Sequence, residues 1–138
     1  MEPDRSKSLQ ELERITWEKP EYPSHLVATC HYLHSLPLKQ WNIENFRMMI
    51  GQNIGLKFLI PLALNYLHKN PFAAGDMYPG DLLVNLLRAD PDFWDQHPQY
   101  CEEVHKIVRE VLSMGQKKKQ RFEHAIALLK AAYEVNWR

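Results

Sequence analysis

Apolar residues along the chain recur mainly at intervals of three and four positions, which is the spacing of one face of an α-helix. After the candidate N-cap Ser24, the residues Leu26, Val27, Cys30 and Leu33 follow this spacing and predict one buried stripe on a helix that ends near residue 36. The same pattern, together with candidate caps and proline or glycine breaks, predicts further helices over about 8–15, 42–50, 56–70, 81–89, 98–114 and 122–133.

The segment 56–70 is apolar on nearly all sides and is expected to form the central buried helix. Pro61 lies inside it, so this helix either begins near Ile60 or is kinked. Sustained period-two alternation and hairpin signals are missing from the sequence. We therefore predict an all-α fold, a single compact domain over 1–138 with six to eight helices in a bundle-like or irregular array. The polar residues 1–8 are expected to be disordered.

Composition excludes several classes of protein without naming one. The 138 residues carry 17 basic and 17 acidic side chains, so the net charge gives no basic excess for coating nucleic acid or an anionic membrane. The longest apolar run, 58–64, is too short to cross a bilayer. The polar N-terminus does not have the pattern of a secretory signal, and two cysteines are too few for a disulfide framework. We expect a cytoplasmic protein without disulfides.

The sequence offers little chemistry for catalysis. Cys30 with His34 and Cys101 with His105 each have the i, i+4 spacing that could present metal ligands on one helix face. Both cysteines, however, fall on the predicted apolar stripes, which favours a role in the core. Phosphate-binding glycine loops and hydrolase motifs are also missing. We therefore predict no enzyme activity and no catalytic residue, cofactor, metal or small-molecule substrate.

The distribution of charge along the chain is more informative about function than the net charge. Residues 1–75 carry 8 basic and 7 acidic groups, residues 76–110 carry 3 and 8, and residues 111–138 carry 6 and 2. Large rings, among them Tyr78 and Trp94, lie within the acidic segment. Acidic side chains around aromatic anchors suit docking on a basic partner, although a solvated acidic loop whose rings fill the core would have the same composition.

The basic run 117–121 could contact phosphates, but a solvated loop is the ordinary interpretation of such a run. It supports an alternative function, in which the chain is a small helical nucleic-acid-binding or regulatory protein. Near the middle of the chain, Gly51 and Gly55 bracket Gln52, Asn53 and Ile54. We interpret this segment as a structural junction between helices, rather than as a binding segment.

Two long segments are familiar in combination. They read Ile50-Gly51-Gln52-Asn53-Ile54-Gly55 and Gly75-Asp76-Met77-Tyr78-Pro79-Gly80-Asp81-Leu82-Leu83, and Phe93-Trp94 follows them. In this order they resemble the small immunity proteins of bacterial contact-dependent growth inhibition (CDI) systems. The resemblance extends over about residues 9–95.

The resemblance implies an antitoxin that binds the toxic C-terminal domain of a CDI exoprotein, in many cases a nuclease, and neutralises it by occluding its active site. Such a protein needs no catalytic residues, no membrane and no direct contact with nucleic acid. Since a nuclease presents a basic substrate groove, the acidic segment is the candidate binding face. Asp81 is also a candidate helix cap. The candidate partner-binding residues are Asp76, Tyr78, Asp81, Asp90, Asp92, Trp94, Asp95, Glu102 and Glu103.

Overall fold

The computed structural model describes residues 2–137, which form nine α-helices and one 3₁₀ helix and include no strand. This confirms the prediction of an all-helical fold. The helices are α1 (Leu9–Glu13), α2 (His25–Ser35), η1 (Leu38–Gln40), α3 (Ile43–Gly51), α4 (Leu56–Lys69), α5 (Asp81–Leu87), α6 (Pro91–Gln96), α7 (Pro98–Leu112), α8 (Gln116–Arg121) and α9 (Glu123–Asn136). Within residues 2–137, every helix is too short or too polar to span a lipid bilayer.

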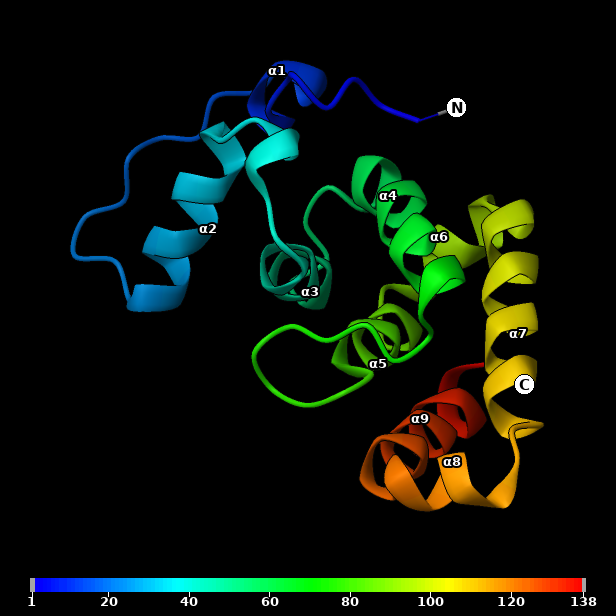
Figure 1. Ribbon diagram of the computed structural model, residues 1–138. Helices are drawn as coiled ribbons and strands as arrows, with labels where there is room; N and C mark the ends of the chain where they lie inside the picture. Colours follow the sequence, from blue (N-terminus) through cyan, green and yellow to red (C-terminus); the bar gives the residue numbers. More distant parts are fainter. Residues whose placement is uncertain (1, 138) are drawn as a thin grey trace.

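The core lies around α4 and α5 (Figure 1). Helix α4 packs against α3, α5 and α7, whereas α5 also packs against α3 and α9. Burial on several sides of α4 confirms its predicted central place, since Leu59, Ile60, Leu62 and Leu64 are all at most 2% exposed. The helix begins at Leu56 and continues through Pro61, so a start near Ile60 is excluded.

Three helices begin at side-chain N-caps, the predicted Ser24 among them, whose oxygens accept hydrogen bonds from backbone amides one turn later. Ser8 accepts from the Glu11 amide at 3.2 Å, Ser24 from Val27 at 3.2 Å, and Asn42 from Asn45 at 2.9 Å. Ser8 is also buried, and the Leu38 and Lys39 amides of η1 donate to the carbonyls of residues 7 and 5. The expectation of a disordered 1–8 stays a prediction, but the structure gives residues 5–8 fixed partners.

Two short helices were not expected. Helix α6 follows Asp90, whose carboxylate accepts from the Asp92 amide at 3.0 Å, and Pro91 occupies the first turn. Helix α8 contains the basic run, so the prediction of a loop is wrong, whereas Lys117, Lys118 and Arg121 are exposed to solvent as predicted. Both helices are six residues long, which is too short for an apolar stripe to reveal them.

Helix α2 departs from its predicted packing. Cys30, Leu33 and His34 are buried, but Leu26 and Val27, which were expected to continue the buried stripe, are 41% and 40% exposed. The helix lies at one edge of the molecule and packs mainly on α1 (Figure 1). Its C-terminal half is anchored by His34, whose Nε2 lies 2.7 Å from Glu13 Oε1 and whose ring stacks on Trp17.

Candidate functional site

The nine predicted partner-binding residues do not form one surface. The structure places two of them in the buried interior and two in the loop before α5. The remaining five lie together on α6 and the first turns of α7. The members of this last group are Asp90, Asp92, Asp95, Glu102 and Glu103.

Asp81 faces inward and has no exposed surface to offer a partner. Its Oδ1 accepts from the Gly75 amide at 2.6 Å, and its Oδ2 accepts from the Met77 and Tyr78 amides at 3.0 and 3.3 Å. Oδ2 also lies 3.9 Å from Nε of Arg47. Asp81 was predicted as a helix N-cap, but Gly80 is the N-cap and the carboxylate turns back to hold the preceding loop. Its role here is structural.

Trp94 is also buried, with 7% of its surface exposed. Its ring lies 4.7 Å from the ring of Trp137, at the end of α9. Among the described residues, its indole N–H is buried and has no hydrogen-bond partner. Trp94 therefore fills the space between α6 and α9 and is not an exposed anchor.

Asp76 and Tyr78 belong to the loop before α5. The Asp76 amide donates to Glu44 Oε1 of α3 at 2.9 Å, while its carboxylate side is exposed. The Tyr78 ring is half-buried and meets His124 of α9 edge-on at 5.8 Å. Burial is the main reason that the pKa of Tyr78 lies above its ordinary value. These two residues contact α3 and α9, and not the cluster on α6 and α7.

We call the five clustered carboxylates, Asp90, Asp92, Asp95, Glu102 and Glu103, the acidic surface. From residue 89 to residue 105 the chain carries these five negative charges and neither lysine nor arginine. Asp95 and Glu102 both lie near Cys101, because their charges, after burial, contribute to raising the pKa of its thiol. Four of the five are exposed, and Glu103 is partly exposed beside His68, with Oε1 3.1 Å from Nε2.

Aromatic rings of α6 and α7 stack on one another within the same stretch of chain as the acidic surface. Phe93 stacks on His97 at 4.2 Å, and Tyr100 lies parallel to Phe93 at 6.4 Å. The His97 Nδ1 lies 2.9 Å from the Phe93 carbonyl oxygen, which fixes the turn between α6 and α7. These contacts hold the turn between α6 and α7, and with it the backbone that carries the carboxylates.

The segment between Gly51 and Gly55 adjoins this surface. Asn53 takes a left-handed conformation, with φ of 58°, and its Oδ1 accepts from the Asp90 amide at 2.9 Å. The Asn53 side chain thus provides the acceptor for the Asp90 amide at the start of α6. This contact is consistent with the predicted structural junction. Gln52 is exposed at the same place.

A hollow of about 200 Å³ lies beside the acidic surface, between α4 and α7. Tyr100, half-buried, and Glu103 contribute a ring and a carboxylate to it. Tyr100 was not among the predicted binding residues, although its place among the acidic residues was the available signal. The full lining is Glu2, Pro61, Leu64, Asn65, Tyr100 and Glu103.

The two Cys-x-x-x-His pairs are each engaged separately. His34 pairs with Glu13, and His105 Nδ1 lies 2.6 Å from the Tyr133 hydroxyl. Burial raises the pKa of both the Cys30 and the Cys101 thiol, which opposes formation of a nucleophilic thiolate. Within residues 2–137, the His, Cys, Asp and Glu side chains form no group of three or more that could hold a metal ion.

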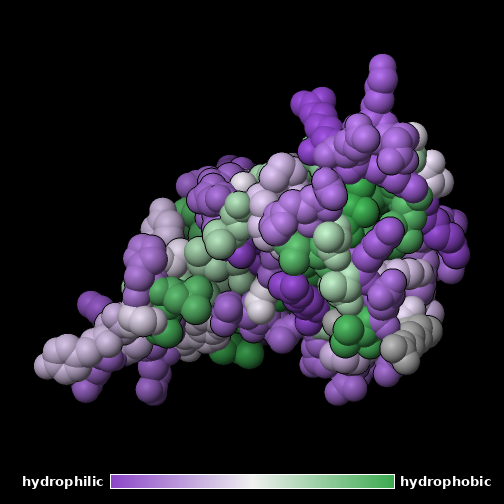
Figure 2. Space-filling view, turned by 90° about the horizontal axis from the view of Figure 1, so that it is seen from below, coloured by the Kyte–Doolittle hydropathy of each residue, from purple (hydrophilic) through white to green (hydrophobic). Residues whose placement is uncertain are grey.

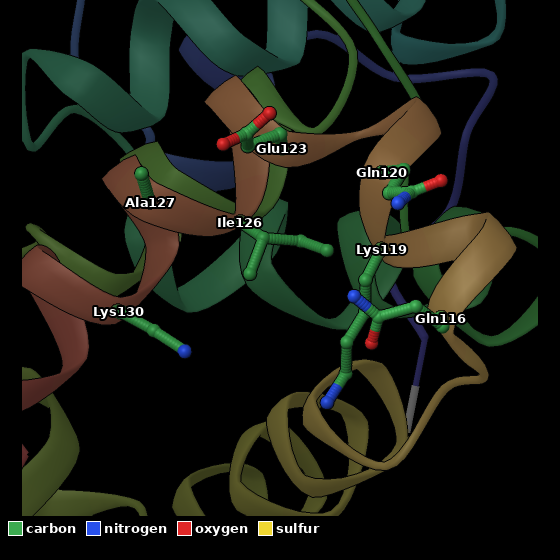
Figure 3. Close-up of a pocket in the computed structure, with 7 residues that line it drawn as sticks. All are labelled: Gln116, Lys119, Gln120, Glu123, Ile126, Ala127 and Lys130. Atoms are coloured by element: carbon green, nitrogen blue, oxygen red, sulfur yellow. The ribbon is translucent and has the colours of Figure 1, made fainter.

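Part of the basic run lines a larger hollow, of about 440 Å³, between α8 and α9 (Figure 3). Lys119 and Lys130 extend toward it from the two helices, and Glu123 is on its rim. Two lysines and one glutamate give this lining a small positive balance. The remaining lining residues are Gln116, Gln120, Ile126 and Ala127.

No curated protein matches the sequence. A sequence model of the family described as CDI immunity proteins, by contrast, matches residues 11–104, which include α2 to α6 and the first turns of α7. Immunity proteins of this kind are inhibitors of toxins and not enzymes. The matched range contains both familiar segments and the whole acidic surface. The chain therefore belongs to the family of CDI immunity proteins, and its role is to neutralise a cognate CDI toxin.

Proposed function

We propose that the cognate toxin is a nuclease and that the acidic surface neutralises it by occupying its substrate groove. The observation that carries the proposal is the concentration of five carboxylates between residues 89 and 105, a stretch of sequence without lysine or arginine, in which, among the described residues, Glu102 alone has a guanidinium beside it, that of Arg109 at 3.5 Å. The toxin is bound in the cytoplasm, where the nucleic acids that it would cleave are located.

The physical basis is that the acidic surface and the nucleic acid compete for the same basic groove of the toxin. A nuclease must attract a polyanion, so its groove is basic and it draws in any rigid acidic surface. Once seated, the carboxylates replace the phosphates and exclude the substrate. The stacked rings of Phe93, His97 and Tyr100 keep this surface rigid, which lowers the entropy lost on binding.

The hollow beside α7 adds a specific contact. A lysine or arginine side chain from the rim of the toxin groove has an apolar stem and a cationic head. Its head would reach the ring of Tyr100 and the carboxylate of Glu103, which are the partly exposed members of the lining on α7.

The test is affinity for the purified C-terminal toxin domain. The double variant Asp92→Lys/Asp95→Lys is expected to weaken binding by at least about tenfold, which corresponds to about 1.4 kcal/mol. The matched control is Glu18→Lys/Glu21→Lys, which makes the same change of net charge at exposed positions before α2. Equal affinities of the two variants and the unchanged chain would refute the assignment of this surface.

The competing function, direct binding of nucleic acid through Lys117, Lys118, Lys119 and Arg121, is tested in the same preparation. A gel-shift assay with generic RNA and DNA at low salt is expected to show no retardation of either. A salt-sensitive shift that Lys118→Glu abolishes would favour the competing function instead.

A further inference from the structure

The hollow between α8 and α9 is positively charged on one side. Two of its lining residues are cations, Lys119 of α8 and Lys130 of α9, and one, Glu123, is an anion. Figure 3 shows the two lysine amino groups below Ile126 in the view and the Glu123 carboxylate above it. The two cations therefore share one side of the hollow, and the anion is turned away from them.

Both lysines are available to an external anion. Among the described residues, neither Lys119 nor Lys130 forms an ion pair, and α8 carries four cations and no anion. Lys119 is partly buried, whereas the other three cations of α8 are exposed. In Figure 2, which views the protein from below, hydrophilic side chains project from the right-hand part, where Figure 1 places α8 and α9. An anion in this hollow would gain charge-assisted hydrogen bonds from two ammonium groups.

The corner between α8 and α9 is fixed to the core. Phe122, between the two helices, stacks on Phe72 at 4.0 Å, and the Arg121 guanidinium lies over the Phe122 ring. Ile126, which lines the hollow, is 6% exposed, and α9 packs against α5. The helices that carry the two lysines are therefore held in fixed positions relative to each other, which favours binding because less backbone freedom is lost.

The lining suits a single carboxylate better than a nucleic acid. Gln116 and Gln120 add amide donors to the two ammonium groups, and a carboxylate accepts from several donors at once. Single-stranded nucleic acid is held by aromatic rings on which its bases stack, and the described lining includes no ring. Glu123 on the rim would also repel a phosphate backbone. An acidic side chain of a protein is the ligand that fits.

The hollow and the acidic surface lie at opposite ends of α7. Figure 1 shows α6 near the upper end of α7 and α8 below its lower end. At about 1.5 Å per residue, the distance along the helix from Glu102 to Leu112 is roughly 15 Å. A standard interface of about 800 Å² per partner is roughly 28 Å across if it is square. One partner of domain size is therefore large enough to cover both places.

The acidic surface alone does not explain why the protein neutralises a cognate toxin. Every nuclease has a basic substrate groove, so a surface of carboxylates attracts all of them. Selectivity needs a contact that the correct partner completes and a wrong partner leaves unpaired. The family model matches residues 11–104, so the whole lining of the hollow lies outside the matched range. The hollow can thus differ between family members while the matched part stays the same.

We propose that the hollow between α8 and α9 binds an acidic side chain of the cognate toxin beside its substrate groove, and that Lys119 and Lys130 thereby select this toxin. The inference rests on the proposed function, which places the groove on the acidic surface. The two contacts have opposite charge, so the toxin docks in one orientation. A toxin that presents more basic groove in place of the acidic side chain is repelled by both lysines.

The test is affinity for the purified C-terminal toxin domain, measured by isothermal titration calorimetry. Lys119→Glu/Lys130→Glu is expected to weaken binding by at least about tenfold. Net charge alone predicts the opposite, because a more negative chain is drawn more strongly to a basic groove. The matched control Lys19→Glu/Lys39→Glu makes the same change of net charge at exposed positions, and it is expected to bind at least as tightly as the unchanged chain.

A non-cognate CDI nuclease domain provides the second readout, since it would bind through its groove alone. Its affinity is not expected to fall in Lys119→Glu/Lys130→Glu, so the ratio of cognate to non-cognate affinity should fall at least about tenfold. Lys119→Gln/Lys130→Gln, which removes the charges without reversing them, should lower this ratio in the same direction by a smaller factor. Circular dichroism checks that each variant keeps its helix content.

Undiminished affinity of Lys119→Glu/Lys130→Glu for the cognate domain would overturn the proposal, as would an equal loss in the control. A gel shift with RNA or DNA that this variant abolishes and the control keeps would show that the hollow binds nucleic acid instead. If the acidic-surface variants bind normally and the hollow variant does not, the proposed function fails and the assignment of the hollow stands.

Discussion

The side-chain oxygen of Asn53 accepts a hydrogen bond from the backbone amide of Asp90 at 2.9 Å and so joins the loop before α4 to the start of α6. Asn53 holds a φ of 58°, a left-handed conformation that asparagine tolerates better than most residues. Asp90 in turn caps α6 and belongs to the acidic surface. One contact thus connects the Gly51–Gly55 junction to the position of the candidate binding residues.

Substitution of Asn53 separates the backbone effect from the hydrogen bond. Asn53→Ala loses both the acceptor and the tolerance for positive φ, so its free energy of unfolding is expected to fall by about 2 kcal/mol. Asn53→Gly loses only the acceptor, so its free energy of unfolding is expected to fall by about 1 kcal/mol. Urea denaturation measures both values. A glycine variant as stable as the unchanged chain would show that the bond to Asp90 contributes nothing.

Asp81 is the acceptor for three backbone amides and is fully buried. Asp81→Asn replaces one oxygen by a donor that faces backbone N–H groups, so unfolding should become easier by roughly 2–3 kcal/mol. The control Asp95→Asn, at an exposed position of α6, should change stability by less than about 0.5 kcal/mol. If both variants unfold at the same urea concentration, the carboxylate does not hold the loop.

The contrast between Asp81 and Asp95 shows how much of the candidate site can be predicted from the sequence. Charge counting places both residues in the acidic segment, because it cannot distinguish a carboxylate that faces solvent from one that meets three loop amides. That distinction depends on the path of the loop 75–80, which α3 and α5 determine together. The same holds for Trp94, whose burial depends on Trp137 from the far end of the chain.

For the fold, helical periodicity succeeds where a helix buries one continuous stripe, as in α7, where Val104, Val108 and Val111 are fully buried. It fails at the start of α2, because the spacing of Leu26 and Val27 predicts an apolar face but not whether another segment reaches it. The start of α6 was readable from Asp90-Pro91, since aspartate followed by proline is a common helix start.

Glu44 predicts a pH dependence of stability. Its Oε2 accepts from the Arg47 guanidinium at 2.7 Å, and this hydrogen bond is the main reason that the pKa of Glu44 is lowered. The folded chain therefore binds this proton less readily than the unfolded chain. The stability that results is complete above the unfolded pKa, near 4.5, and is lost as the pH falls through the lower folded pKa.

Glu44→Gln removes this titration. The variant should be less stable than the unchanged chain at pH 7, and the difference should shrink as the pH falls below about 4. Urea midpoints across this range measure it, and Glu110→Gln at an exposed position of α7 is the control. A stability difference that stays constant down to the lowest pH would contradict the assignment.

Gly55 provides a test of the junction itself. It holds a φ of 64°, and a Cβ at this position would lie 2.8 Å from Cδ1 of the fully buried Leu9. Gly55→Ala combines left-handed strain with this contact and is expected to cost roughly 2 kcal/mol or more. Gly115→Ala is the control, because Gly115 has negative φ and open space around it, and it should cost no more than about 1 kcal/mol, the preference for glycine over alanine at an N-cap. Equal thermal midpoints for the two variants would show that the junction tolerates a side chain.

The acidic surface also predicts how fast the protein meets its toxin. Complementary charge raises the association rate constant, and salt screens it over a Debye length of about 10 Å at 0.1 M. Stopped-flow mixing with the toxin domain should therefore give an association rate constant that falls at least about tenfold between low and high ionic strength. The Asp92→Lys/Asp95→Lys variant should associate slowly at all salt concentrations, with a much smaller dependence on ionic strength, whereas Glu18→Lys/Glu21→Lys should keep most of the original dependence. If the two double variants lose the salt dependence equally, net charge alone steers the encounter and the carboxylates of α6 have no special part in it.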